Sequence, residues 1–342
     1  MPLNVVWVGV GAFVATLIVI PLAKRVAVLN DVTSMPRADR LHEAPTPYLG
    51  GVPIVLVAAV VSPFVGQWQL EGAVIIGGAL LLGVVGLLDD LHNLRPAPRL
   101  VAEVLAAGAA VAAGAHVQIF GGAVDTALTI AWFVGVTNAF NLIDNMDGAA
   151  GGIATATALA LVVTAALNGQ VLVGGMASVV TGTCLAFLIY NWHPARIFMG
   201  DAGALPLGYL LAAIALKLRF PVPHLASVSA IVLFTAPALF DTTLVVISRV
   251  ARHHPIYIGG TDHTSHRLLR LGLRTRVVAS LITATAALCG ALGVAVGRGV
   301  IDPLPVIAPL GLIAVVGLAA LLRLPAEAPI PTDLHGTPAH CD

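Results

Sequence analysis

The sequence is short of charge. Of its 342 residues, 17 are Lys or Arg and 17 are Asp or Glu, so charged side chains make up 10% of the chain, against about 25% in a soluble domain. The formal net charge is zero, which excludes the basic surplus expected of a protein that binds nucleic acid. Hydrophobic residues account for 58% of the chain. This composition is typical of a membrane protein.

Cysteine is also scarce, and the N-terminus carries no basic region before its apolar residues. The three cysteines fit neither a disulfide framework nor a zinc motif. Cys184 and Cys289 lie inside apolar runs, where packing is the expected role. Residues 1–23 are apolar almost from the first residue, so we interpret them as a first membrane span and not as a cleaved signal peptide.

Apolar runs of about 20 residues recur along the whole chain, and they predict an all-α polytopic membrane protein with about 10–11 transmembrane helices. We expect residues 1–324 to form a single transmembrane domain and the Pro-rich, polar residues 325–342 to form a disordered tail. The eleven predicted spans lie near 5–23, 49–66, 72–88, 100–117, 124–140, 152–167, 169–190, 203–217, 224–247, 278–297 and 303–322.

Basic residues gather on one side of these spans. Lys217, Arg219 and Arg298 lie on one face, and the remaining 14 of the 17 (17 minus 3) follow the odd-numbered spans or lie in the loops after them. The positive-inside rule then predicts a protein of the cell (inner) membrane with its N-terminus outside and its C-terminus in the cytoplasm. The same rule brings the polar loops to the cytoplasmic face, where five of them can form one site.

Two of these loops carry clustered polar residues. In the first, Arg40, His42 and Thr46 could contact phosphate, although this loop taken alone favours a solvated basic connector near anionic lipid. In the second, Asp89 and Asp90 end an apolar helix. Neighbours on a helix point in different directions, so we expect different roles for the two carboxylates. Two anions at a helix C-terminus also oppose the helix dipole, which indicates a nearby cation or proton.

The third loop begins in the stretch NAFNLIDNMDG. Its members Asn138, Asn141, Asp144 and Asp147 recur every three residues, and neighbouring members would share one face of a helical turn. Amides and carboxylates in such a row can hold a nucleobase, a ribose or a hard cation. Four polar groups at a membrane edge are costly without a partner.

The fourth loop offers a metal ligand and the fifth a cationic site. Asp201 lies between two glycines just before an apolar run, where it could bind Mg²⁺ together with a diphosphate or could cap the following helix. The fifth loop holds six arginines and four histidines, which favours diphosphate binding over zinc because the loop has no Cys or Glu. Glu103 and Asp241 are acids inside predicted spans. Each could have a functional role or could form a structural hydrogen bond inside the bundle.

Six of these stretches, in this order, resemble the polyprenyl-phosphate N-acetylhexosamine-1-phosphate transferases, a superfamily that includes phospho-N-acetylmuramoyl-pentapeptide transferase. They are HEAPTPYLGG, GLLDD, NAFNLIDNMDG, NWHPARIFMGDAG, PALFDT and DHTSHRL. The resemblance is closest to the WecA-like branch. It implies transfer of an N-acetylhexosamine-1-phosphate, with N-acetylglucosamine as the expected sugar, from a UDP-sugar to a membrane polyprenyl phosphate. The products would be polyprenyl-diphosphate-sugar and UMP, in a reaction that requires Mg²⁺ or Mn²⁺.

The resemblance also implies roles for individual residues. Asp89, Asp90, His263 and His266 would be catalytic, and Asp201 and Asp144 would bind the metal. The substrate-binding positions would be Arg40, His42, Thr46, Asn138, Asn141, Asp144, Asp147, Asn191 and Arg267.

The chain departs from the family pattern at several positions. Asn145 stands where relatives usually have Gly, Ser265 where they have a histidine, and Asp262 where many have Asn; the fourth-loop pattern also ends in Ala204. The expected partners are the UDP-N-acetylhexosamine, the polyprenyl phosphate and membrane lipid, with homodimer formation a further hypothesis. A multi-span transporter of a polar or anionic solute is the main alternative. It would place its site near the membrane midplane and would often show repeats, and we find no internal repeat.

Overall fold

The computed structural model describes residues 3–34, 46–65, 70–117, 119–257 and 259–326. Twelve α-helices and one short antiparallel strand pair, Thr33–Ser34 (β1) with Thr46–Pro47 (β2), make up these ranges. The helices are α1 Leu3–Leu29, α2 Gly51–Val61, α3 Leu70–His92, α4 Pro96–Ala112, α5 Gly122–Ile143, α6 Ala149–Leu167, α7 Val171–Asn191, α8 Asp201–Lys217, α9 His224–Ala251, α10 Thr264–Arg270, α11 Thr275–Gly297 and α12 Leu304–Leu322; a 3₁₀ turn, Ser62–Val65, follows α2.

Each predicted span corresponds to one of these helices, which confirms the all-α polytopic membrane architecture. In the described ranges, eight helices are long and apolar enough to cross a bilayer: α1, α3, α5, α6, α7, α9, α11 and α12. The other three that match predicted spans are shorter, with 17 residues in α4 and α8 and 11 in α2. A helix of 17 residues is at the lower limit for spanning the hydrocarbon core.

Helix α8 is the centre of the bundle. It packs against α3, α5 and α2, and its residues from Ala202 to Ala215 are all buried. Because a side chain in a bilayer gains little from leaving lipid for protein, close packing has to hold such a helix in place. The short, fully enclosed α8 therefore fixes the position of Asp201, its first residue.

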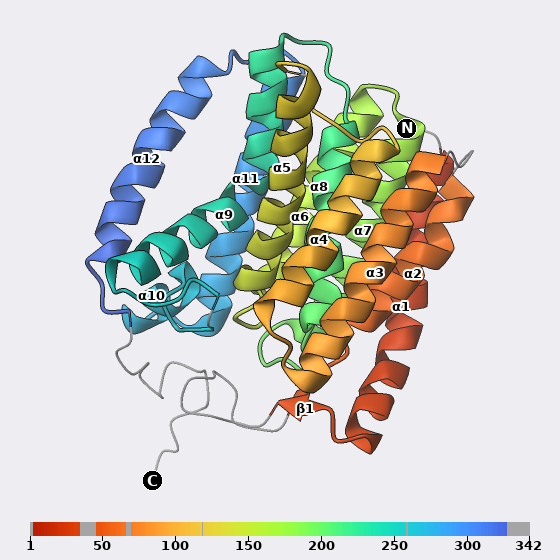
Figure 1. The fold of residues 1–342 in the computed structure, drawn as a ribbon, viewed down its shortest axis with the longest axis vertical. Helices are drawn as coiled ribbons and strands as arrows, with labels where there is room; N and C mark the ends of the chain where they lie inside the picture. Colours follow the sequence, from red (N-terminus) through yellow and green to blue (C-terminus); the bar gives the residue numbers. More distant parts are fainter. Residues whose placement is uncertain (1–2, 35–45, 66–69, 118, 258, 327–342) are drawn as a thin grey trace.

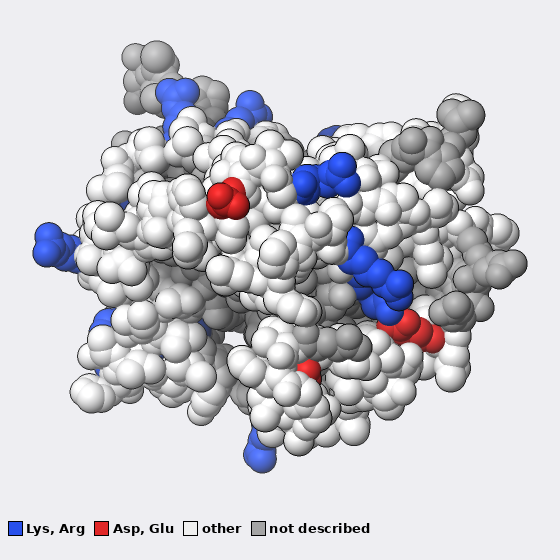
Figure 2. Space-filling view, turned by 90° about the horizontal axis from the view of Figure 1, so that it is seen from above, with Lys and Arg blue, Asp and Glu red and all other residues white. Residues whose placement is uncertain are grey.

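The polar loops lie at one end of the bundle (Figure 1). The strand pair, the C-terminal ends of α3, α5 and α9, and the helix α10 all lie at the lower end of that view. Figure 2 looks at the opposite end, where Lys, Arg, Asp and Glu are scattered over a mostly uncharged surface. The predicted gathering of five loops at one face is thus confirmed. Which compartment this face meets stays a prediction.

Helix α12 stands apart from the bundle (Figure 1). Among the described residues it packs mainly on α9, and Val306 is its one buried residue. Most of its surface is apolar and exposed, as expected of a helix that lipid surrounds. Of the predicted tail 325–342, residues from 327 onward lie outside the described residues, as do Arg40 and His42.

Candidate active site

The two carboxylates that end α3 point in different directions, as predicted. Asp89 accepts a hydrogen bond from the amide of Leu94 at 2.6 Å and one from Arg99 Nη1 at 3.2 Å. Asp90 faces the other way and accepts the amides of Asp201 and Ala202 at 2.9 and 3.0 Å. Asp89 therefore connects the end of α3 to the loop before α4 and to the start of α4, whereas Asp90 connects α3 to α8.

Asp90 performs the capping role that the sequence analysis offered as an alternative for Asp201. The first amides of a helix have no partner within it and favour a negative charge, and Asp90 supplies this charge from another helix. Gly200 precedes α8 with φ of +70°, and a Cβ there would lie 2.5 Å from Asp90 Oδ2. Glycine is thus required by both the backbone conformation and the close carboxylate.

Because Asp90 caps the helix, the side chain of Asp201 is available for other partners. Its Oδ1 accepts a hydrogen bond from Asn141 Nδ2 at 2.7 Å, and its Oδ2 lies 3.1 Å from Arg99 Nη1. The same Arg99 nitrogen also contacts Asp89. One guanidinium therefore holds together two carboxylates that are 112 positions apart in the chain (201 minus 89).

The backbone of the first loop supports the segment before Asp201. The amides of Gly50 and Gly51 donate to the carbonyl oxygens of Phe198 and Met199 at 2.8 and 2.9 Å, and the amide of Phe198 donates to Pro47. A Cβ on Gly51 would lie 2.2 Å from the Cα of Gly203. The glycine pair of the first loop thus allows two backbones to meet. Thr46 begins this segment and is buried.

The row in NAFNLIDNMDG is helical only in its first part: Asn138 and Asn141 lie three residues apart on α5, whereas the predicted sharing of a helical turn does not extend to Asp147. Helix α5 ends at Ile143, so Asp144 is its C-cap and Asp147 lies beyond it. Asn138 bonds to Glu103 of α4, Asn141 bonds to Asp201, and Asp147 accepts hydrogen bonds from the amide of Ala195 and from His193 Nδ1. The early end of the helix sends the four side chains to different partners.

Asp144 lies at a concentration of negative charge. Its partial burial, together with the charges of Asp201 and Asp90, raises its pKa to about 8. Four carboxylates, those of Asp89, Asp90, Asp144 and Asp201, lie in this cluster, and two of them, Asp89 and Asp201, contact the guanidinium of Arg99. Such a surplus of oxygen ligands suits a hard divalent cation.

The donor set fits Mg²⁺ held partly by substrate. No group of three or more His, Cys, Asp or Glu side chains in the described ranges is arranged to bind a metal by itself. Magnesium usually keeps several waters and takes one or two carboxylates plus substrate phosphates. Asp201 and Asp144 satisfy that requirement, since each carboxylate oxygen has a lone pair beyond the contacts described.

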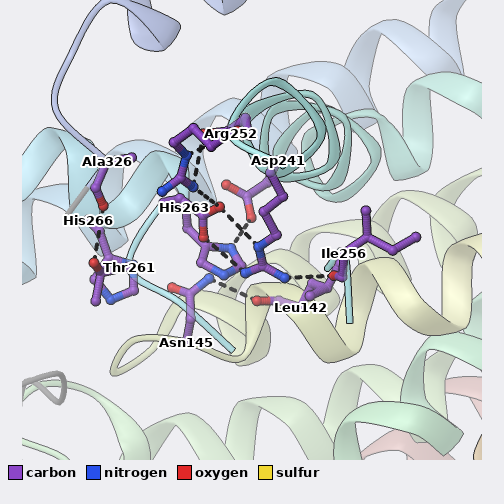
Figure 3. A network of polar contacts seen from close by, with 12 residues as sticks. Leu142, Asn145, Asp241, Arg252, Ile256, Thr261, His263, His266 and Ala326 are labelled. Carbon is purple, nitrogen blue, oxygen red and sulfur yellow. Dashed lines mark hydrogen bonds and ion pairs between the residues drawn. The ribbon is translucent and has the colours of Figure 1, made fainter. Parts of the chain in front are cut away.

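A second polar cluster occupies the fifth loop (Figure 3), and arginines dominate it. Arg249 forms two hydrogen bonds with Asp262, at 3.0 and 2.9 Å, and Arg252 adds a third at 3.0 Å. Burial would raise the pKa of Asp262, but the hydrogen bonds and charge of Arg249 outweigh it and hold the pKa below its usual range. Asp262 is therefore the buried counter-ion of this loop.

The predicted catalytic histidines lie in the same cluster and are buried. His263 Nδ1 lies 2.8 Å from Asp241 Oδ2, so the acid inside α9 orients this ring. The ring centroids of His263 and His266 are 5.6 Å apart. Burial and the neighbouring charges of His263 and Arg270 lower the pKa of His266 to about 3, so this imidazole is neutral at neutral pH.

Two predicted substrate-binding residues hold segments of the chain together. Arg267 is 1% exposed, and its three nitrogens donate to the carbonyl oxygens of Asp262, Leu321 and Leu324 and to Ser248 Oγ at 2.6–2.9 Å. It thereby fastens the end of α12 to α10. Asn191 accepts the amide of Gly148 and donates to Ile197, which joins α7 to the start of α6.

Comparison with known proteins gives this arrangement a family. The model of the family described as "Glycosyl transferase family 4" matches residues 73–219, which run from α3 to α8 and include Asp89, Asp90 and Asp201. The chain is 31% identical over 278 residues to the "Probable undecaprenyl-phosphate N-acetylglucosaminyl 1-phosphate transferase" of Bacillus subtilis, covering 78% of this chain and 77% of the relative. The chain belongs to glycosyl transferase family 4.

Further relatives extend this match over most of the chain. The "Decaprenyl-phosphate N-acetylglucosaminephosphotransferase" of Mycobacterium leprae is 28% identical over 317 residues, with 80% of this chain and 79% of the relative covered. The "Phospho-N-acetylmuramoyl-pentapeptide-transferase" of Limosilactobacillus fermentum is 37% identical over 202 residues, with 52% of this chain and 62% of the relative covered. The predicted resemblance is confirmed.

Asn145 and Ser265, which depart from the pattern that the resemblance led us to expect, meet each other. The hydroxyl of Ser265 donates to Asn145 Oδ1 at 2.6 Å, and Asn145 Nδ2 in turn donates to Leu142 (Figure 3). The bond connects the loop after α5 with α10, and so joins the carboxylate cluster to the histidine cluster. No sequence signal indicated this pairing, because 120 positions separate the two residues.

Three residues of the site were not predicted from the sequence: Arg99, His193 and Arg249. Arg99 was counted as one more cytoplasmic basic residue, although its position four residues before Glu103 on α4 could have marked it. His193 Nδ1 lies 2.8 Å from Asp147 Oδ2, which accepts its hydrogen bond. Arg249 lies in the last turn of α9 and is 3% exposed. An arginine that must stay buried is indistinguishable by sequence from one that follows the positive-inside rule.

Proposed function

We propose that this member of the family transfers an N-acetylhexosamine-1-phosphate from a UDP-sugar to a membrane polyprenyl phosphate. An oxygen of the acceptor phosphate forms a bond to the β-phosphorus of the UDP-sugar, and the bond from that phosphorus to the oxygen that bridges it to the α-phosphorus breaks. The products are polyprenyl-diphosphate-sugar and UMP. The names of the Bacillus and mycobacterial relatives support N-acetylglucosamine as the sugar.

One observation carries the proposal: carboxylates from the ends of α3 and α5 and the start of α8 meet at one end of a membrane bundle. Asp90 fixes Asp201 through the backbone of α8, and Arg99 lies between Asp201 and Asp89. A lipid acceptor brings its phosphate to this level of the membrane while its chain stays among apolar side chains. A soluble nucleotide can reach the same end from water.

Charge neutralisation is the chemical task of this site. Acceptor phosphate and nucleotide diphosphate repel each other, and phosphoryl transfer depends on alignment and on neutralising the oxygens. Mg²⁺ or Mn²⁺, held by Asp201 and Asp144, would supply positive charge to the diphosphate. Arg99 adds a guanidinium at the same place, and Asn141 keeps the Asp201 carboxylate in its orientation.

The two carboxylates of α3 have separate roles in this proposal. Both oxygens of Asp90 accept amides of α8, so Asp90 positions Asp201. Asp89 lies beside Asp201 through their common contact with Arg99, and we propose that it is the α3 carboxylate that acts on the acceptor phosphate. His263 and His266 lie in the second cluster, and Asn145 and Ser265 connect it to the first.

The transporter alternative has little support. The carboxylates gather at one end of the bundle instead of near its middle, and the relatives are named as transferases. We further propose that this end faces the cytoplasm, with the N-terminus outside. The gathering of basic residues near the same loops supports this orientation.

The test is a product assay on the purified, full-length protein in nanodiscs. UDP-N-acetylglucosamine, UDP-N-acetylgalactosamine and UDP-N-acetylmuramoyl-pentapeptide are each offered with polyprenyl phosphate and Mg²⁺, and UMP is measured. We expect UMP only when both substrates and a divalent cation are present, and none after EDTA. Solute uptake into proteoliposomes without UMP release from any donor would refute the transferase proposal in favour of transport.

A further inference from the structure

A groove opens at the end of α1, apart from both polar clusters. Its volume is about 530 Å³, and none of the residues proposed above as catalytic or metal-binding lines it. One wall comes from the last turns of α1, and the other comes from the end of α7 and the segment that follows it. Its lining residues are Pro21, Lys24, Arg25, Val28, Leu29, Tyr190 and Arg196.

The surface of the groove is almost entirely apolar, basic residues border it, and it lies at headgroup depth. Lys24, Arg25 and Arg196 line it, and no acidic side chain of the described residues does. Lys24 follows Leu3, the first residue of α1, by 21 positions (24 minus 3), which corresponds to about 32 Å at 1.5 Å per residue. The hydrocarbon core is about 30 Å thick, so a helix that enters it near Leu3 brings Lys24 to the phosphates of the opposite leaflet.

Arg196 is held in place, which distinguishes the groove from a general basic surface. Its Nη2 donates to the carbonyl oxygen of Ile189 at 2.7 Å, and its guanidinium lies 5.4 Å from the centre of the Tyr190 ring. Tyr190 in turn donates to Leu17 of α1 at 3.3 Å. Such contacts reduce the side-chain entropy that binding would otherwise cost, and leave the remaining guanidinium donors free to form a fork for phosphate oxygens.

We propose that this groove binds the headgroup of an anionic phospholipid of the same leaflet. The phosphate lies between Lys24 and Arg196, and the acyl chains follow the exposed apolar side chains Leu22 and Ile18 of α1. A diacyl phospholipid is the occupant and not the polyprenyl phosphate acceptor, because the groove is separate from the carboxylate site.

A bound lipid would stabilise the segment that carries the site. Arg196 lies between Asn191, the last residue of α7, and Asp201, the first residue of α8. The amide of Arg196 donates to Tyr190 at 2.8 Å, and the amides of Ala195 and Phe198 are bonded to Asp147 and Pro47. An ion pair with Arg196 therefore acts on a segment whose hydrogen bonds reach both the first and third loops.

The experiment measures lipid binding directly and needs no enzymatic activity. Full-length protein is incorporated into nanodiscs of phosphatidylcholine with 0, 10 or 30% phosphatidylglycerol, and retention of phosphatidylglycerol after transfer to detergent is measured by native mass spectrometry. The groove variant is Lys24→Gln with Arg196→Gln. The matched control is Arg274→Gln with Arg323→Gln, which removes the same charge at the same end of the bundle but outside the groove.

We expect the wild type and the control to retain phosphatidylglycerol over phosphatidylcholine by at least about tenfold, and the groove variant to lose this preference, given the attraction of each basic residue near an anionic surface. Equal losses in both variants would overturn the proposal, because they would show a general charge effect. Displacement of phosphatidylglycerol by equimolar polyprenyl phosphate in the wild type but not in the groove variant would also overturn it, by assigning the groove to the acceptor lipid.

Discussion

The two polar clusters at the loop end of the bundle use the same residue types with opposite charge balance. In the first, the carboxylates of Asp89, Asp90, Asp144 and Asp201 lie together, and Arg99 contacts two of them, Asp89 and Asp201. In the second, Arg249 and Arg252 enclose the carboxylate of Asp262, and His263 pairs with that of Asp241. Surplus negative charge raises the pKa of Asp144 to about 8, whereas surplus positive charge holds the pKa of Asp262 below its usual range.

The difference in charge balance indicates that the first cluster is a functional site and that the second stabilises the fold. A cluster with unbalanced like charges costs stability until a cation or substrate arrives, and strongly perturbed groups of this kind mark functional sites. A cluster in which buried charges are paired and hydrogen-bonded resists change and holds the chain together. We therefore expect the same substitution to affect activity in the first cluster and folding in the second.

The largest effect is expected from replacing an aspartate in each cluster. Asp201→Asn removes the proposed metal ligand, so UMP release should fall at least about 100-fold, while the unfolding temperature stays the same or rises because a like charge is gone. Asp262→Asn leaves Arg249 buried without its counter-ion, and should lower the free energy of unfolding by about 3 kcal/mol. Product assays and thermal unfolding in detergent measure both variants, and the comparison fails if the two variants show the same pattern.

A smaller effect is expected from exchanging arginine for lysine. Arg99 contacts its two aspartates through a single nitrogen, so Arg99→Lys should keep activity within about tenfold of the wild type and leave stability unchanged.

Arg267 uses three nitrogens on four oxygens, a geometry that lysine cannot reproduce. Arg267→Lys should lower the free energy of unfolding by about 2 kcal/mol. A stable Arg267→Lys protein with reduced UMP release would instead place Arg267 at the substrate.

The smallest effect concerns pH. The pKa of His266 is lowered to about 3 in the folded protein, whereas an unfolded histidine takes up a proton below about 6.5. The unfolded state therefore binds more protons as the pH falls, and stability should decline below pH 6.5.

His266→Gln should reduce this decline by about 1 kcal/mol between pH 7 and pH 5.5, as measured by chemical unfolding at each pH. His224→Gln, at an exposed histidine on the opposite end of the bundle, is the control and should leave the wild-type pH profile unchanged. If His266→Gln has the wild-type profile, His266 is protonated in the folded protein and could act as an acid.

The fold was largely predictable because a bilayer makes strong demands on sequence. Each apolar run became a helix, since a chain in lipid has to satisfy its backbone hydrogen bonds internally. The errors fall where this demand ends. Helix α10 lies in the loop that was interpreted only as basic and histidine-rich, and the row from Asn138 to Asp147 was extended as a helix beyond Ile143. The spacing of residues in the sequence cannot indicate where a tertiary contact of a loop stabilises the chain more than one further turn of helix would.

The sequence by itself determined which segments form apolar helices and which loops gather at one end, because hydropathy and charge act on each segment separately. It also indicated Asp89, Asp90 and Asp201 as a group through their motifs. Only the tertiary structure decided that Asp90 caps the helix that begins with Asp201 and that Arg99 lies between two of the carboxylates. It also decided that the guanidinium of Arg267 donates its hydrogen bonds within the protein, including one to the end of α12. These contacts join residues far apart in the chain, and their hydrogen bonds exist only once the helices have packed.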